Sequence, residues 1–263
     1  MFLCRRSDGC QLTTSTPQPP LLETIVPDWP APPPVRACST TRRGGFSDLP
    51  YQALNLADHV GDDPAAVAAN RRRLGQVLAL PAEPCWLRQV HGTRVVAASA
   101  TGPVAEADGA FTDRHGVVCA VLTADCLPVL LCTTAGDWVA AAHAGWRGLA
   151  HGVLEAAMDA APVAGDGLLA WLGPAIGPQS FEVGDEVRQA FLARDSRGAE
   201  AFVPGAGGRW IADLYRLARQ RLAARGVHAV FGGGLCTFRD AGRFFSFRRD
   251  GRTGRMASLI WLE

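Results

Sequence analysis

Three residues of the kinds that bind metal ions each stand where an apolar, strand-like run gives way to a turn. They are His91, Cys126 and His143. The end of a strand commonly carries reactive groups, because the sheet holds them rigidly in place. A set of three nitrogen and sulfur donors is a recognised catalytic zinc arrangement, which leaves a fourth position for water or substrate. Their spacing matches no local zinc-finger rule, so the fold would have to bring them together.

The same residues are compatible with a chemistry that needs no metal. Cys126 would act as a thiolate nucleophile with His143 as its general base, as in Cys–His hydrolases. Asp125 is a candidate for orienting the histidine, although neighbours on a strand point to opposite faces. Its alternative role is that of a carboxylate that caps a turn. The residues alone leave the metalloenzyme and thiol-enzyme hypotheses open.

The composition argues against several classes of function. The chain has 263 residues, 48% of them apolar, and a formal net charge of +1. These values fit a globular protein with a sizeable core and give no basis for nucleic-acid or membrane-surface binding. All 26 basic residues are arginine, which excludes a Schiff-base lysine and a P-loop lysine. A phosphate group would have to be bound by arginine side chains or backbone amides.

The cysteines and the N-terminal residues indicate a compartment and a domain boundary. The eight cysteines contain no Cys-x-x-Cys pair, so they predict neither a disulfide framework nor a zinc ribbon. The first residues turn polar too soon for a signal peptide, and no run approaches the roughly 18 apolar residues of a membrane span. We therefore expect a cytoplasmic protein. Residues 1–25 are expected to be a disordered leader and 26–263 one catalytic domain.

The apolar patterning predicts a chain of mixed strands and helices. Strands are expected at 35–40, 85–90, 93–99, 116–123, 137–143, 168–172, 228–236, 243–248 and 256–262. Helices are expected at 148–161, 184–194 and 213–225, and from the Asp-Asp-Pro sequence that ends at Pro64 to about Leu80. No internal repeat and no linker divides the middle of the chain. The economical interpretation is a single α/β (α+β) domain with a mixed sheet.

Between residues 26 and 263 the chain carries a series of ordered motifs that resembles one known family. The motifs are Ser39-Thr-Thr-Arg-Arg-Gly-Gly45, Asn55-Leu, His59-Val-Gly-Asp62, Gln89-Val-His-Gly92, Ala107-Asp-Gly109, Thr123-Ala-Asp-Cys126, Ala142-His-Ala-Gly-Trp-Arg-Gly148, Leu172-Gly-Pro-Ala-Ile-Gly-Pro178, Phe181-Glu-Val-Gly184, Cys236-Thr237, Phe244-Phe-Ser-Phe-Arg-Arg-Asp250 and Thr253-Gly-Arg255. In this order they resemble the YfiH family, known as laccase-domain or polyphenol-oxidase proteins and later as purine nucleoside phosphorylases.

The resemblance implies a fold, a metal site and a set of activities. The fold is a mixed-sheet α/β sandwich related to the catalytic domain of cytotoxic necrotizing factor toxins, which are Cys–His hydrolases. The family's zinc ligands fall on His91, Cys126 and His143. Its activities are phosphorolysis of adenosine, inosine and S-methyl-5′-thioadenosine, deamination of adenosine, and copper-dependent oxidation of phenols; some bacterial members are linked to editing of peptidoglycan precursors. We therefore expect Zn²⁺, with Cu²⁺ as the alternative, and a nucleoside and phosphate as ligands of a monomer or homodimer.

Phosphorolysis requires an anion site, and arginines in glycine-rich, turn-like segments are the candidates. The expected substrate-binding or phosphate-binding residues are Arg42, Arg43, Asn55, Gln89 and Arg248. Arg147 precedes an expected helix start, a location that favours anions. It is therefore a catalytic candidate beside Cys126, His143 and Asp125.

Deamination and phenol oxidation place different demands on the chain. A zinc ion lowers the pKa of bound water from 15.7 towards ~7, which allows attack on C6 of adenine at neutral pH. The nucleobase deaminase signature is absent, so Asp125 and Glu182 are candidates for carrying the proton. The chain has six histidines, too few for the several coppers of a multicopper laccase. A single His/Cys/His site would still bind copper.

Overall fold

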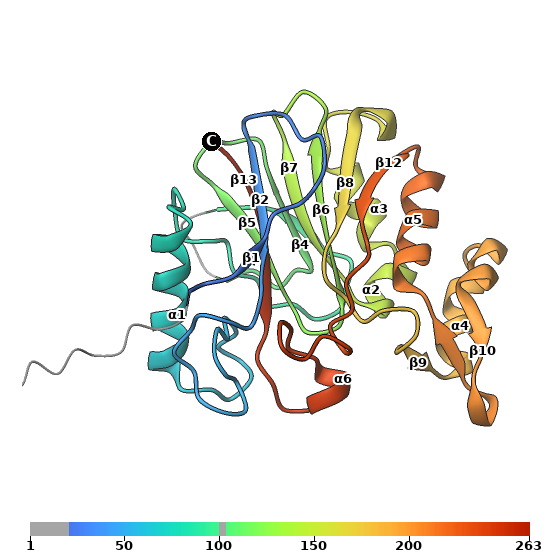
Figure 1. Cartoon of the computed structure of the whole chain (residues 1–263). Coiled ribbons are helices and arrows are strands. Elements are labelled where there is room, and N and C mark those ends of the chain that lie inside the picture. The colour runs from blue at the N-terminus through green and yellow to red at the C-terminus, as the bar shows by residue number, and fades with distance from the viewer. Residues whose placement is uncertain (1–20, 100–103) are drawn as a thin grey trace, which may run out of the picture.

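The computed structural model describes residues 21–99 and 104–263, which form two stacked β-sheets with helices on both outer faces (Figure 1). One sheet has four antiparallel strands in the order β1 (Thr24–Ile25), β2 (Val35–Thr40), β13 (Met256–Leu262) and β5 (Val118–Thr123). The expected leader ends inside this sheet, because β1 pairs with β2. Residues 1–20 of that leader lie outside the described residues.

The second sheet has six strands, and both of its edge pairs are parallel while the inner pairs are antiparallel. Its order is β12 (Ala229–Gly232), β8 (Leu168–Leu172), β6 (Leu127–Thr133), β7 (Val139–Ala144), β4 (Gly109–Thr112) and β3 (Val95–Ala97). A small third sheet has the order β10 (Phe202–Pro204), β11 (Trp210–Ala212) and β9 (Glu182–Val183).

Alternation along the central strands builds separate cores on the two faces of the six-stranded sheet. Leu130 of β6 is fully buried against the four-stranded sheet, with Val121 and Ile260. Val129 and Leu131, its neighbours, belong to the core under the helices. Successive strand residues point to opposite faces, so one strand serves both cores. The face of the six-stranded sheet that carries Val129 and Leu131 is covered by α2 (Trp146–His151), α3 (Val153–Asp159) and α5 (Leu214–Ala224).

The remaining helices cover the four-stranded sheet and the lower ends of the strands. α1 (Pro64–Val77) packs Leu74 onto Val118 and Leu259 of the four-stranded sheet. Its N-cap is Asp63, whose side chain accepts from Ala65 N at 3.0 Å. The other helical segments are α4 (Asp185–Leu192), α6 (Phe247–Asp250) and 3₁₀ turns at Gly165–Gly167, Ser196–Ala201 and Ala206–Gly208. Among the described residues, no helix is both long and apolar enough to span a membrane.

Several expected elements differ from the structure for identifiable reasons. β6 was not predicted, because it is buried on both faces and therefore lacks a period-two pattern. The expected helix over 148–161 is split by Gly152, whose φ of 107° ends one helix and begins the next. The expected strand at 85–90 makes only isolated bridges. In place of the expected strand at 243–248, a turn at 241–243 leads to the buried Phe244 and Phe245, and residues 247 and 248 already belong to α6.

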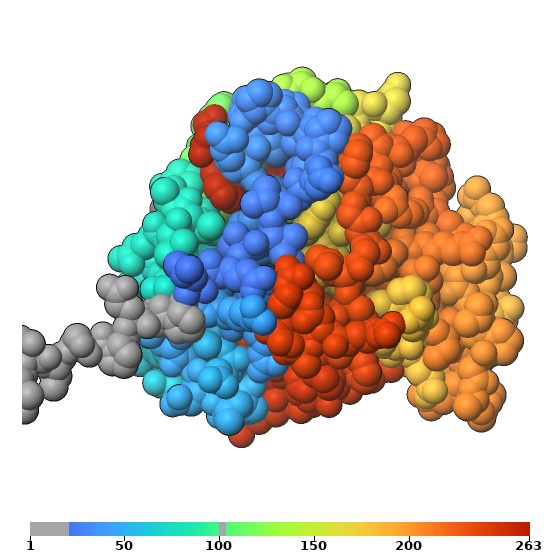
Figure 2. Space-filling model, in the orientation of Figure 1, coloured from blue at the N-terminus to red at the C-terminus, as the bar shows by residue number. Residues whose placement is uncertain are grey.

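The C-terminal segment that contains this turn packs beside the N-terminal segment, although they are far apart in sequence (Figure 2). Arg42 donates to the backbone oxygen of Ala241, and Arg43 donates to that of Gly242. α6 lies at the lower end of the sandwich, where the β5–β6 connection passes from one sheet to the other (Figure 1). This end of the sandwich therefore gathers segments from much of the chain.

Candidate metal centre

His91, Cys126 and His143 meet at the lower end of the sandwich, with their ligand atoms all within 4.8 Å of one another. Sγ of Cys126 lies 3.8 Å from Nε2 of His91. The two imidazole rings meet edge to face, with centroids 4.9 Å apart. His143 is in β7, Cys126 in the β5–β6 connection and His91 in the loop before β3. The fold thus brings together the three residues selected from the sequence.

A buried carboxylate, Asp108, lies directly behind this group. Nδ1 of His143 donates to Oδ1 of Asp108 at 2.8 Å, which leaves Nε2 of the histidine free to act as a ligand. The same carboxylate accepts from the backbone amides of Val90, His91 and Gly92. Carboxylates placed in this way fix the ring orientation of histidine ligands and raise their basicity. Asp108 therefore positions both histidines.

The backbone around the group adopts conformations that side chains rarely tolerate. His91 has φ of 61° and Asp125 has φ of 90°, both in the left-handed region. Gly145 leaves space for the group, since a Cβ there would lie 2.9 Å from Sγ of Cys126 and from Cδ2 of His91. Such strain persists only where the surroundings impose it, and it clusters at functional sites.

Mutual electrostatics shift the pKa values of Cys126 and His143. Burial would raise the pKa of the Cys126 thiol, but the charge of His143 and hydrogen bonds from His143 and His91 lower it to about 6. Burial would lower the pKa of His143, but the charge of Cys126 and the hydrogen bond to Asp108 raise it to about 9. Each group therefore favours the charged form of the other, the thiolate of Cys126 and the imidazolium of His143. The thiolate is the form that binds metals and attacks electrophiles.

Two residues expected to take part in the chemistry also hold the scaffold. The amide of Gln89 pairs with both backbone groups of Leu122, at 2.8 and 2.7 Å, and so ties the loop before His91 to the end of β5. The carboxylate of Asp125 accepts from Thr237, Ser246 and the backbone amide at Arg248. Asp125 thus accepts a first-turn amide of α6, whose N-cap is Ser246, and this contact matches the capping role considered as its alternative.

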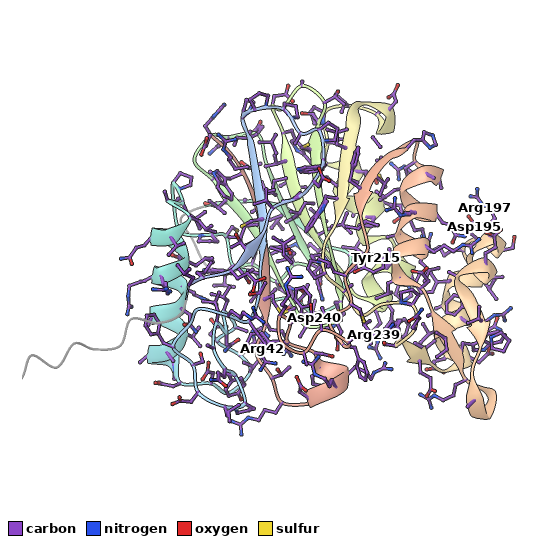
Figure 3. All side chains as sticks on the ribbon, viewed as in Figure 1. Arg42, Asp195, Arg197, Tyr215, Arg239 and Asp240 are labelled. Carbon is purple, nitrogen blue, oxygen red and sulfur yellow. The ribbon has the colours of Figure 1, made fainter. Side chains whose placement is uncertain are left out.

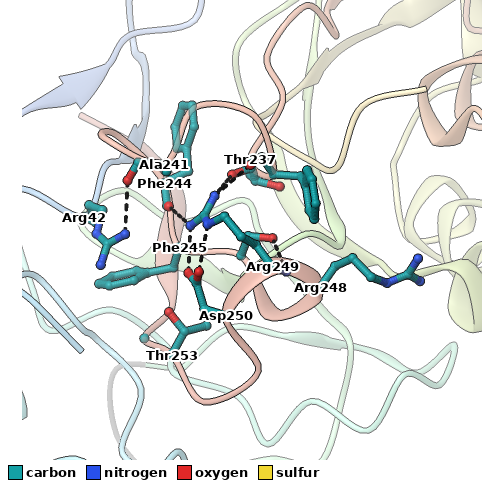
Figure 4. Close-up of polar contacts among 12 residues, drawn as sticks. Arg42, Thr237, Ala241, Phe244, Phe245, Arg248, Arg249, Asp250 and Thr253 are labelled. Atoms are coloured by element: carbon teal, nitrogen blue, oxygen red, sulfur yellow. Dashed lines mark hydrogen bonds and ion pairs between the residues drawn. The ribbon is translucent and has the colours of Figure 1, made fainter. Parts of the chain in front are cut away.

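α6 is fixed further by Arg249, whose guanidinium donates to the backbone oxygens of Thr237, Phe238 and Phe244 and pairs with Asp250 (Figure 4). Arg248 points away from this network in the same view. α6 therefore projects the neighbouring Phe247 and Arg248 from a rigid base.

The His91–Cys126–His143 group lies at the junction of two cavities. We call the first the Arg255 lobe; its volume is 320 Å³ and it is lined by His59, Gln89, His91, Leu122, Thr123, Ala124, Cys126, His143, Phe247 and Arg255. We call the second the aromatic lobe; its volume is 230 Å³ and it is lined by His91, Ala124, Asp125, Cys126, Trp146, Arg147, Ile176, Phe181, Leu214, Phe247 and Arg248. Both lobes are lined by His91, Ala124, Cys126 and Phe247, so these four residues lie where the lobes meet.

The expected anion-binding residues are distributed over different places. Arg147 and Arg248 line the aromatic lobe. Arg42 and Arg43 line another cavity, of 610 Å³, that shares no lining residue with either lobe. Arg42 lies near Asp240 in the lower part of the molecule (Figure 3). Their role in phosphate binding stays a prediction.

The other two expected polar residues lie outside both lobes. Asn55 is fully buried and uses its side chain to bind Ala57, Asp62 and the backbone amide of Arg255. Glu182 pairs with Arg209 at 2.8 Å, and it does not line either lobe.

The sequence interpretation assigned no role to three residues that the structure places at the site. Asp108 and Arg255 both lie in motifs quoted above, Ala107-Asp-Gly109 and Thr253-Gly-Arg255, which was the available signal. Phe247 also lies in such a motif, but an aromatic residue there is more commonly part of a core. The contacts of all three depend on segments distant in the chain.

Comparisons with known proteins add to this geometry. Residues 36–263 match the family described as multi-copper polyphenol oxidoreductase laccase. A purine nucleoside phosphorylase of Pseudomonas aeruginosa is 59% identical over 91% of this chain and 98% of its own length. The purine nucleoside phosphorylase YfiH of Escherichia coli is 55% identical over 90% of this chain and 98% of its own. The chain belongs to the YfiH family.

Solved structures of YfiH-family proteins have the same fold. A Neisseria meningitidis protein matches with a TM-score of 0.88 and 51% identity, over 91% of this chain and 99% of its own. YlmD of Geobacillus stearothermophilus matches with a TM-score of 0.83 and 32% identity, over 88% and 93%. The expected single-domain mixed α/β fold is therefore confirmed.

The donor atoms of this YfiH-family chain fit a bound metal ion. The group offers two imidazole nitrogens and a thiol whose pKa is lowered, with Asp108 holding His143 from behind. Nitrogen and sulfur donors suit both zinc and copper. The fit indicates a metal centre.

Proposed function

We propose that the chain is a zinc-dependent purine nucleoside enzyme. It converts adenosine, inosine and S-methyl-5′-thioadenosine with phosphate to the free base and ribose 1-phosphate or its 5′-methylthio analogue, and it also deaminates adenosine. The observation that carries this proposal is the His91–Cys126–His143 group at the junction of two cavities, in a chain more than half identical to named purine nucleoside phosphorylases. We further propose that it works in the cytoplasm, as a monomer or homodimer.

His91, Cys126 and His143 would hold the zinc ion. Bound zinc supplies a Lewis acid that polarises oxygen and lowers the pKa of water. Asp108 keeps the proton of His143 on Nδ1, so that Nε2 faces the group. The aromatic side chains that line the adjoining lobe would exclude water from one side once a substrate is bound, which would strengthen the electrostatic interactions within the site.

In phosphorolysis, an oxygen of phosphate forms a bond to C1′ of the nucleoside. The bond between C1′ and N9 breaks, its electron pair stays with the purine, and the purine takes up a proton. The protein has to bind the phosphate, place it near C1′ and stabilise the leaving base. In deamination, water adds at C6 and ammonia leaves. Asp125 and Arg147 remain the proposed catalytic partners, Asp125 lining the aromatic lobe with Arg147.

A second candidate is a Cys–His hydrolase that acts on a peptidoglycan precursor. The specific observation in its favour is the chain of contacts from Asp108 through His143 to Cys126, which has the order of a carboxylate–histidine–thiolate triad. A copper-dependent polyphenol oxidase is the third candidate, favoured by the description of the matching family and by donors that also suit copper.

Chromatography of adenosine and inosine reactions, with and without phosphate, separates these candidates. The proposal predicts that zinc-loaded protein forms adenine or hypoxanthine only with phosphate, and forms inosine from adenosine without it. Cys126→Ala should lose both activities. If metal-stripped protein is fully active on a peptidoglycan precursor and inert toward nucleosides, the hydrolase is correct instead. If only copper-loaded protein turns over, and only phenols are consumed, the oxidase is correct.

A further inference from the structure

We propose that the two lobes bind different parts of the substrates, with inorganic phosphate in the Arg255 lobe and the purine base in the aromatic lobe. Arg255 is the principal phosphate-binding residue in this assignment. The inference rests on the proposed phosphorolysis, and it names a residue that the sequence interpretation did not select.

The guanidinium of Arg255 is held in place by the backbone and keeps N–H groups available to bind an anion. Its Nη1 donates to the backbone oxygens of Thr253 and Gly254, at 2.8 and 3.0 Å, which fixes the plane of the group. Across residues 21–99 and 104–263, Nε and Nη2 of Arg255 have no hydrogen-bond partner. Two free N–H edges on a fixed, partly buried guanidinium match the geometry of two phosphate oxygens. The backbone amide of Arg255 is held by the fully buried Asn55.

Other donors converge on the same lobe. His59 and the hydroxyl-bearing Thr123 line it with Arg255, and His91 and His143 of the metal centre line it too. A phosphate in this lobe would therefore lie beside His91, Cys126 and His143. No carboxylate lines the lobe among the described residues, and the Cys126 thiolate in its wall is offset by the imidazolium of His143.

The aromatic lobe differs in the side chains that line it. Trp146 and Phe181 are among its walls, and Ile176 and Leu214 add apolar surface. Its two arginines already lie against aromatic rings: Arg147 is 4.5 Å from the Trp146 centroid, and Arg248 is 5.3 Å from that of Phe181. Flat rings and guanidinium planes favour stacking on a purine. Arg248 also donates to the backbone oxygen of Glu182, which leaves it fewer free donors.

Phe247 lies at the boundary between the proposed phosphate and purine sites. Its ring lines both lobes, and the Arg255 guanidinium lies 5.8 Å from its centroid. A nucleoside whose base occupies the aromatic lobe would direct its ribose past Phe247 towards the metal centre, and so towards the phosphate. Arg42 cannot take this role in the same geometry, because its cavity shares no residue with either lobe.

The test measures both substrates of inosine phosphorolysis and phosphate binding itself. Arg255→Met should raise KM for phosphate about 10- to 100-fold, the effect of losing a charge-assisted contact, with KM for inosine changed less than about threefold. Arg255→Lys should recover part of the loss. Trp146→Leu should raise KM for inosine about tenfold and leave KM for phosphate unchanged. Broadening of the ³¹P resonance of inorganic phosphate, without nucleoside, gives the binding constant directly.

Two further variants and a folding measurement complete the design. Arg219→Met is the matched control, because Arg219 also binds two backbone oxygens, at Val230 and Gly232, but lies outside both lobes. Arg42→Met tests the competing assignment. Circular dichroism melting confirms that each variant is folded. An unchanged phosphate affinity in Arg255→Met, or a loss of phosphate affinity in Arg42→Met alone, overturns the inference. If wild type releases no base with phosphate, the proposed function fails, and the ³¹P titration still decides the phosphate site.

Discussion

His143 and Asp108 are joined twice, by a backbone hydrogen bond from His143 N to Asp108 O at 2.7 Å and by the 2.8 Å contact of their side chains. They come from the antiparallel neighbours β7 and β4, or directly beside them. The sheet register therefore sets the orientation of one candidate metal ligand. Since Asp108 also binds the loop that carries His91, one carboxylate positions two of the three ligands.

Replacement of this carboxylate by an amide is expected to weaken metal binding while leaving the fold intact. Asp108→Asn should lower the affinity for zinc about 10- to 100-fold, because the histidine loses its oriented, charged acceptor. Competition with a chromogenic chelator measures the affinity. Asp159→Asn, which changes an exposed carboxylate in α3, is the control and should not alter it. Equal zinc affinities in wild type and Asp108→Asn would remove the assigned role.

Removal of the thiol is expected to abolish stoichiometric zinc binding. Purified wild type should carry close to one zinc ion per chain, and Cys126→Ala should carry little, since two imidazoles alone bind weakly. Metal content is measured by inductively coupled plasma mass spectrometry. Cys236→Ala removes another partly buried thiol that lines neither lobe and should keep its zinc. Full zinc occupancy in Cys126→Ala would contradict the ligand assignment.

A single methyl group at Gly145 is expected to disrupt the centre. In Gly145→Ala the new Cβ would lie 2.9 Å from both Cys126 and His91, so at least one ligand must move. Zinc occupancy should therefore fall, as measured by the same metal analysis. Gly75→Ala is the control, because a Cβ there meets nothing within 4 Å. It should keep its zinc and gain about 0.5–1 kcal/mol of stability, since alanine is favoured inside a helix.

Alkylation of the metal-free protein should follow the lowered pKa of Cys126. A thiol whose pKa is about 6 becomes reactive as the pH rises through that value, whereas an ordinary thiol does so near 8.5. After chelation, the iodoacetamide rate at Cys126 should rise between pH 5 and about 7 and then level off. Peptide mass spectrometry locates the adduct. In His143→Ala the rise should move to higher pH; a rate that still climbs steeply above pH 8 in wild type would contradict the lowered pKa.

Some elements were predictable because a local rule decides them. β2 and β13 have the expected bounds, Val35–Thr40 and close to 256–262. The helix after Asp63 begins as expected, because a side-chain cap and a proline at the first turn specify a helix start. The three candidate metal ligands were also predictable, since chemistry and position relative to strand ends select them.

The partners of those ligands could not be derived in the same way. Asp108 reaches His143 only because β4 pairs with β7, and the strand β4 was not predicted. Arg255 faces the centre because Asn55, far earlier in the chain, holds its backbone amide. Both relationships depend on long-range register, which local periodicity does not encode. A motif indicates that such residues are important, but their contacts, and therefore their roles, depend on the fold.

The passage of the chain between the two sheets at Cys126 has a mechanical consequence. Gln89 fastens the His91 loop to the four-stranded sheet, while His143 belongs to the six-stranded one. An ion held by His91, Cys126 and His143 would cross-link the two sheets at one end. Loading with metal would then suppress sliding of one sheet over the other and raise the melting temperature in proportion to the logarithm of free metal concentration. Metal binding at this centre would thus control the thermal stability of both sheets.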